Sequence, residues 1–134
     1  MDRRRFLRIG YRLHSNIIGI NGVDNCAQRL FRTIRCVAVD IQEMANEKMS
    51  EKPNVRWIQS YSAIINDRMQ LIQDNLIKLG ANKKCINETL KLVEQNDVYN
   101  ANCNVLQLLA QRHPRAYKRK LAAYQRYIEQ KQRG

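Results

Sequence analysis

The stretch DNCAQRLFRTIRCVAVDIQEMANEKM, from Asp24 to Met49, decides the fold class. Its apolar residues recur every three or four positions, and they are Ala27, Leu30, Ile34, Val37, Ile41 and Met44. This spacing places them on one face of an α-helix, which turns once in about 3.6 residues. We therefore expect an amphipathic helix, with Asp24 as its N-cap and Asn21-Gly22 as the turn before it.

A second amphipathic helix is expected after a break in the pattern at residues 52–54. Pro53 is well placed to open it, because a proline in the first turn leaves no intrahelical hydrogen bond unmade. The helix should run to about Leu79. Gly80 then favours the left-handed conformation that ends a helix, and Asn82 is a typical cap for the next one.

A third helix should follow and is expected to bend or split at the polar stretch 95–97. Pro114 should end it and start a last helix, which carries one apolar stripe of Tyr117, Leu121, Tyr124 and Ile128. At the other end of the chain, residues 1–20 predict a further amphipathic helix with Phe6, Ile9, Leu13 and Ile17 on one side.

Together these elements predict a single all-α domain spanning residues 1–134. Short connections favour antiparallel neighbours, so residues 24–112 should form an up-down-up three-helix bundle, similar to a spectrin repeat in plan only. Basic amphipathic helices at residues 1–20 and 114–134 should flank this core. If their links reverse the chain, both fold back, and the arginines of the two segments, such as Arg8 and Arg119, form one continuous positive face.

The positive charge is concentrated at the two ends of the sequence. The formal net charge is +12, of which residues 1–14 carry +4 and residues 112–134 carry +7. The middle 97 residues have eleven basic and ten acidic side chains, a net charge of only +1. Solubility needs no such partition, because a modest charge spread over the surface is enough. Localised charge indicates a localised anionic partner.

Nucleic acid is the partner that this charge favours, because phosphates neutralised by Lys and Arg release counterions. The segments show no helix-turn-helix, zinc-finger or RNA-recognition motif, so we expect contact with RNA or DNA phosphates without sequence-specific readout. Tyr127 projects beside the apolar stripe, where it can stack on a base. The predicted contact residues are Arg3, Arg4, Arg5, Arg8, Arg12, Arg115, Lys118, Arg119, Lys120, Arg126, Tyr127, Lys131 and Arg133.

Other functions remain open from the sequence. The main alternative is a helical subunit or adaptor whose exposed stripes pair with other helices, self-association included. A mature secreted cytokine is a further alternative, since the chain has four cysteines and a glycosylation pattern at Asn87-Glu88-Thr89. The arginine-rich N-terminus also resembles a mitochondrial presequence and fits binding to a membrane surface. With these alternatives set aside, we expect an intracellular protein of the nucleus or cytoplasm.

No catalytic, metal or cofactor motif is found in the sequence. The five glycines form no phosphate-binding loop, and the four cysteines form no CxxC pair. Cys26, Cys36, Cys85 and Cys103 are therefore expected to be buried, reduced thiols that pack as small apolar residues. No apolar run reaches the roughly 18 residues that span a membrane. The prediction is a protein that is not an enzyme and binds no metal or cofactor.

Overall fold

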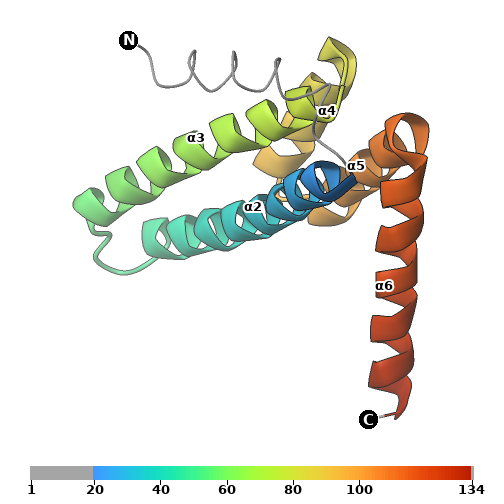
Figure 1. Cartoon of the computed structure of the whole chain (residues 1–134). Helices are drawn as coiled ribbons and strands as arrows, with labels where there is room; N and C mark the ends of the chain where they lie inside the picture. The colour runs from blue at the N-terminus through green and yellow to red at the C-terminus, as the bar shows by residue number, and fades with distance from the viewer. Residues whose placement is uncertain (1–19, 134) are drawn as a thin grey trace.

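The computed structural model describes residues 20–133, which form helices joined by short loops (Figure 1). The helices are α2 (Ile20–Lys48), α3 (Val55–Lys78), α4 (Lys83–Glu94), α5 (Val98–Arg112) and α6 (Pro114–Arg133). No β-strand occurs within this range. The predicted all-α class is confirmed, and the further predictions for residues 1–19 lie outside the described residues.

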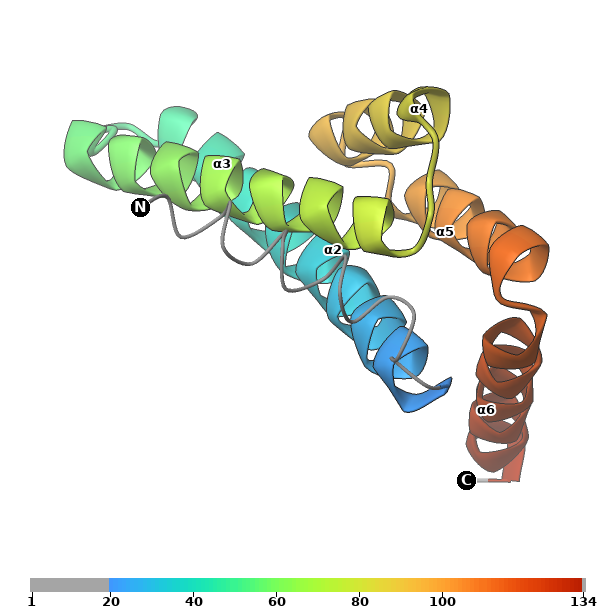
Figure 2. The ribbon, with the colours of Figure 1, turned by 45° about the horizontal axis from the view of Figure 1, so that its top comes forward.

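The two long helices, α2 and α3, lie side by side and antiparallel (Figures 1 and 2). The apolar stripe of α2 meets that of α3 in the core, where Leu30, Ile34 and Val37 are completely buried. Ile72 and Leu76 of α3 are equally buried. Burial of each such side chain stabilises the fold by roughly 1.5–3 kcal/mol. This packing confirms four of the six apolar positions predicted for α2, whereas Ile41 is only partly buried and Met44 lies outside the core.

The expected third helix is divided into α4 and α5. Its predicted break at residues 95–97 is a split: Asn96 has a φ of 59°, and Asp97 caps α5 by accepting a hydrogen bond from the Asn100 backbone N–H at 3.2 Å. A residue in the left-handed region stops helical propagation. The helices α4 and α5 fold back on each other at one end of the α2–α3 pair (Figure 2). The three-helix, spectrin-like plan is therefore not confirmed.

The start of α2 differs from the prediction. The helix begins at Ile20 and continues through Asn21-Gly22, so the expected turn is absent and Asp24 is not its N-cap. A glycine inside a helix costs only about 1 kcal/mol relative to alanine, so neighbouring interactions can outweigh it. Asp24 lies one turn inside α2, and its carboxylate accepts two hydrogen bonds from Arg119 of α6.

The cap of α3 also lies further along the chain than predicted. Asn54 is the N-cap, since its Oδ1 accepts a hydrogen bond from the Trp57 backbone N–H at 3.2 Å, and Pro53 precedes it. The signals at the other end of α3 are confirmed. Gly80 has a φ of +89°, and Asn82 caps α4 by accepting from the Cys85 backbone N–H at 2.8 Å.

The last helix, α6, starts at Pro114 as predicted but packs on the body only through its first turns. Ala116 is buried, and Tyr117 packs against the core. Arg119 forms a two-bond ion pair with Asp24 of α2, with Nε–Oδ2 and Nη2–Oδ1 distances of 2.8 and 2.9 Å. From Ala122 to Arg133 every residue is exposed, and the helix extends away from the body (Figure 1). Among the described residues, α6 therefore does not fold back along the bundle.

Replacement of a core leucine tests the α2–α3 packing. The Leu76→Ala substitution should lower the free energy of unfolding by about 2–5 kcal/mol, because it leaves a cavity where the side chain is completely buried. The matched control is Ile77→Ala, one residue along the same helix at 45% exposure, which should cost less than about 1 kcal/mol. Urea unfolding followed by circular dichroism measures both. Equal losses would contradict the packing described.

The ion pair between Asp24 and Arg119 should contribute modestly to the attachment of α6. Both side chains are more than a third exposed, so solvent screening limits their coupling to roughly 1 kcal/mol or less. A double-mutant cycle with Asp24→Asn and Arg119→Gln should give a coupling of this size in urea unfolding. Arg119→Gln should also speed amide exchange in the first half of α6, whereas Arg126→Gln, further along the helix, should not.

Candidate nucleic-acid interface

The predicted contact residues are divided between the two ends of the chain. The N-terminal five lie outside the described residues, and they are Arg3, Arg4, Arg5, Arg8 and Arg12. The other eight all belong to α6. The continuous positive face expected from both segments therefore stays a prediction, and the geometry of α6 is what the structure describes.

Two of the α6 cations face the body of the protein. Arg119 donates both of its hydrogen bonds to the Asp24 carboxylate, so a phosphate would have to displace that carboxylate. The Lys120 Nζ lies 4.7 Å from the centre of the Phe31 ring, a cation–π contact with α2. The sequence pattern made Arg119 a predicted phosphate contact, because nothing in it revealed that Asp24 would lie beside α6. These two side chains attach the helix rather than extend the free basic surface.

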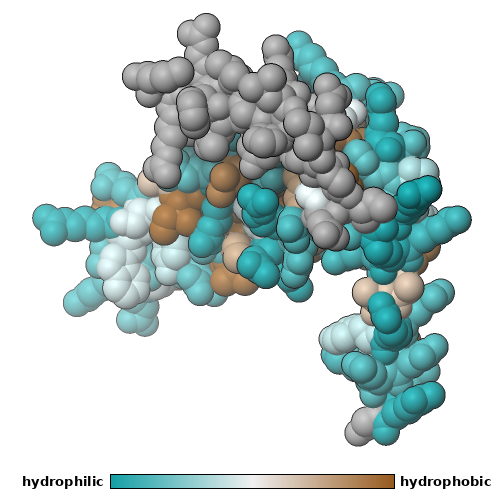
Figure 3. Space-filling model, viewed as in Figure 1, coloured by the Kyte–Doolittle hydropathy of each residue, from teal (hydrophilic) through white to brown (hydrophobic). Residues whose placement is uncertain are grey.

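The remaining cations are exposed. Arg115 and Lys118 lie at the start of α6, and Arg126, Lys131 and Arg133 lie on the half that extends from the body. Glu129 is the only acidic residue of the helix. The surface of this half is predominantly hydrophilic (Figure 3). An extended helix with one acid and several cations concentrates positive potential along its length.

An aromatic side chain lies within this basic surface. Tyr127 is 51% exposed, and the Lys131 Nζ lies 5.0 Å from the centre of its ring. Hydrogen bonding with Tyr127 raises the pKa of Lys131 above its ordinary value, which favours the ammonium form. An exposed ring beside a cation is a combination that single-stranded nucleic-acid sites use, the ring for a base and the cation for a phosphate.

The apolar stripe of α6 is docked only at its beginning. Tyr117 packs against the core and Leu121 is half-buried, but Tyr124 is 60% exposed and Ile128 is 37% exposed. The four residues therefore belong to one helix, as predicted, but the body of the protein covers their stripe only as far as Leu121. The sequence could not show this, because an amphipathic stripe has the same appearance whether or not a neighbouring helix covers it.

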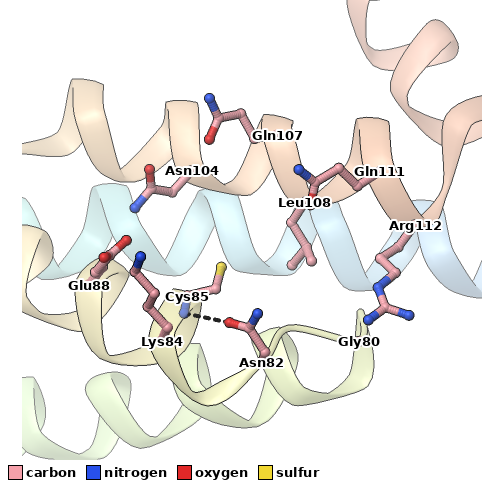
Figure 4. A pocket seen from close by; sticks show the side chains of 10 residues that line it. All are labelled: Gly80, Asn82, Lys84, Cys85, Glu88, Asn104, Gln107, Leu108, Gln111 and Arg112. Atoms are coloured by element: carbon pink, nitrogen blue, oxygen red, sulfur yellow. Dashed lines mark hydrogen bonds between the residues drawn. The ribbon is translucent and has the colours of Figure 1, made fainter.

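A shallow groove between α4 and α5 was not predicted from the sequence. It has a volume of about 210 Å³, and Lys84, Glu88 and Asn104 lie at one end of it, with Arg112 at the other (Figure 4). Sites for small organic ligands are larger and mostly apolar. This groove is lined by side chains of both charge signs, so it does not select an anion. No sequence signal marks it, because its residues come from two helices and from the loop before α4, which have independent patterns.

The four cysteines are free, although they are not all buried as expected. Only Cys26 is buried, and this burial raises the pKa of its thiol, which lowers its reactivity. Cys36, Cys85 and Cys103 are partly exposed. Within residues 20–133, no group of three His, Cys, Asp or Glu side chains is placed to hold a metal ion.

None of the helices between Ile20 and Arg133 combines the length and apolar character needed to cross a membrane. Comparisons with protein families, with curated proteins and with solved structures found no match to this chain.

Proposed function

We propose that this chain is a non-enzymatic protein that binds RNA or DNA through phosphate contacts. The observation that carries the proposal is the extended half of α6, residues 122–133, in which every side chain is exposed and Arg126, Lys131 and Arg133 are basic. Helix faces buried in a bundle cannot reach a polyanion. This half of α6 offers its charge to a ligand approaching from several directions.

The dimensions of α6 suit a contact with several phosphates. Its 20 residues measure about 30 Å along the axis. Phosphates in a duplex provide one negative charge per roughly 1.7 Å of axis, so a helix of this length faces many of them. The sequence contains no helix-turn-helix, zinc-finger or RNA-recognition motif, which favours backbone contact over sequence readout.

Single strands are the targets that the pair of Tyr127 and Lys131 favours. A base stacked on an exposed tyrosine contributes on the order of 1–3 kcal/mol and requires no particular sequence. Stacking needs an unpaired base, which a duplex does not present. We therefore place single-stranded RNA or DNA ahead of a duplex as the ligand of α6.

A second candidate function is that of a helical adaptor in a protein complex. It is favoured by Tyr124 and Ile128, whose exposed side chains continue the apolar stripe past the point where the body covers it. A partner helix could bury these residues through an i, i+4 contact. In this alternative the basic residues of α6 would meet an acidic protein surface.

Removing charge from the extended half of α6 tests the leading proposal. The triple substitution of Arg126, Lys131 and Arg133 to glutamine should weaken binding to a random single strand and reduce the slope of log affinity against log salt by about 2. The matched control replaces Arg32, Arg35 and Lys48, three exposed cations of α2, with glutamine. Fluorescence anisotropy over a salt titration measures both.

The two variants have the same net charge, so the control separates localised binding from general attraction. Equal weakening in both would contradict a site on α6. Binding to heparin that persists in the α6 variant, with no binding of labelled RNA or DNA by the native chain, would favour the adaptor.

Replacement of Tyr127 tests base stacking separately from charge. The Tyr127→Ala substitution should weaken single-strand binding by about 1–3 kcal/mol and leave the salt slope unchanged, because no phosphate contact is lost. The control is Tyr99→Ala on α5, which removes a tyrosine of 77% exposure from a different surface. Unchanged affinity in Tyr127→Ala would exclude stacking by this ring.

A further inference from the structure

Three large apolar side chains are uncovered along one side of α3. Trp57, Ile64 and Leu71 are 58%, 40% and 52% exposed, and they stand seven residues apart. At about 100° per residue this spacing keeps them within roughly 40° of one another, along about 21 Å of helix. Single exposed apolar residues are ordinary, but an aligned set with a polar rim is typical of an interaction surface.

The rim of this surface on the α2 side is acidic. Arg68, which falls on the same side of α3, forms an ion pair with Asp40 of α2. A hydrogen bond with Glu43 raises the pKa of Tyr61, so that carboxylate also lies at the α2–α3 boundary. Glu47, one helical turn further, accepts a backbone N–H of the α2–α3 loop at its Oε1. Three carboxylates thus follow α2 beside the exposed stripe of α3.

We call this surface the α2–α3 face, made up of Trp57, Ile64 and Leu71 with Asp40, Glu43 and Glu47. An apolar stripe beside a row of carboxylates fits a helix of the opposite kind, with one apolar side and arginines along its border. Asp40 is already balanced by Arg68. Glu43 and Glu47 are bound by neutral donors, so they retain the negative charge that attracts such a helix.

The chain contains a segment with this composition directly before α2. Residues 1–19 have five arginines and one acid, and their apolar positions are Phe6, Ile9, Leu13 and Ile17. They join α2 at the end that packs beside the C-terminal part of α3, where the Cys26 Sγ lies 3.4 Å from the Asn75 Oδ1. The α2–α3 face begins next to this point at Leu71 and continues away from it toward Trp57.

The length of the segment matches the surface. Nineteen residues measure about 28 Å as a helix, which is enough to cover the 21 Å stripe after one reversal of the chain. A covalently linked segment also acts at a millimolar effective concentration, so weak apolar and ionic contacts are sufficient to hold it. A second copy of the chain would bind the same surface equally well only at a millimolar protein concentration.

We propose that residues 1–19 dock on the α2–α3 face, with their apolar positions against Trp57, Ile64 and Leu71. Arginines at the border of the apolar stripe then pair with Glu43 and Glu47, and the others point outward. The proposal is independent of nucleic-acid binding by α6. It assigns the N-terminal arginines to two uses, the attachment of the segment and a basic outer surface.

The single tryptophan of the chain, Trp57, reports this docking directly. In the full-length protein, Leu13→Asp should raise the acrylamide quenching constant of Trp57 roughly twofold and shift its emission to the red, because the ring loses its cover. Leu71→Asp should have the same effect from the other side of the contact. The double variant should show no further change, since both substitutions remove one interaction.

The matched control is Ile77→Asp, which adds the same charge to α3 at a position of 45% exposure, about 120° around the helix from Leu71. It should leave Trp57 unchanged, and circular dichroism should show that all variants keep their helices. Identical quenching in the native, Leu13→Asp and Leu71→Asp proteins would overturn the proposal. Quenching of the native protein that increases on dilution would also overturn it, by identifying a second copy as the occupant.

Discussion

The burial of the α2 stripe is the constraint on which the described structure depends. Leu30, Ile34 and Val37 lose all contact with water, and residues from α3, α4 and α5 contribute to the same core. A helix of 29 residues with one apolar side has to be covered along that side, and α3 alone covers only part of it. The α4–α5 pair covers the rest near one end, which explains why the molecule is thicker there (Figure 2).

Two buried polar side chains, Asn75 and Thr89, are hydrogen-bonded where the helices meet, whereas the buried Asn102 Oδ1 has no hydrogen-bond partner within residues 20–133. Asn75 donates its amide to the Leu71 carbonyl at 3.0 Å and accepts from the Cys26 thiol, so its burial leaves neither end unpaired. The Thr89 hydroxyl accepts from the Asn104 amide at 3.4 Å across the α4–α5 contact. Because an unpaired buried polar group costs about 1–3 kcal/mol, such pairs favour one register of the helices over its neighbours.

The sequence alone predicted the elements better than their arrangement. Periodicity identified most of the core of α2, and glycine, asparagine and proline signals located the end of α3 and the starts of α4 and α6, since these depend on neighbours within a few residues. Asp24 shows the limit of local reasoning. It has the character of an N-cap, yet it lies inside α2 and forms an ion pair with Arg119, a residue 95 positions away. The sequence predicted a bend or a split at residues 95–97. Which of the two occurs, and that α4 and α5 then fold back on each other, depends on packing.

The candidate interface was also predicted in its local composition but not in its arrangement. Charge counting located the basic segment, because charge needs no partner to be recognised, but it did not show that the second half of this segment extends from the body. It did not separate the cations that attach α6, Arg119 and Lys120, from those that extend from the body. The helical projection also could not tell where the apolar stripe of α6 loses its cover. Both distinctions come from the angle at which α6 leaves α5, which is set by tertiary contacts at Ala116 and Tyr117.

The unsupported half of α6 has a thermodynamic consequence for any ligand that binds it. Residues 122–133 are exposed throughout, so this part of the helix relies on its own backbone hydrogen bonds. Isolated helices shorter than about 12–15 residues are marginal in water, and such an end opens locally while the body stays folded. A ligand that binds only the helical form completes a folding reaction as it binds. Calorimetry would then record a heat-capacity change and an unfavourable ordering entropy larger than the buried contact area alone produces, and both would grow as temperature frays the free helix.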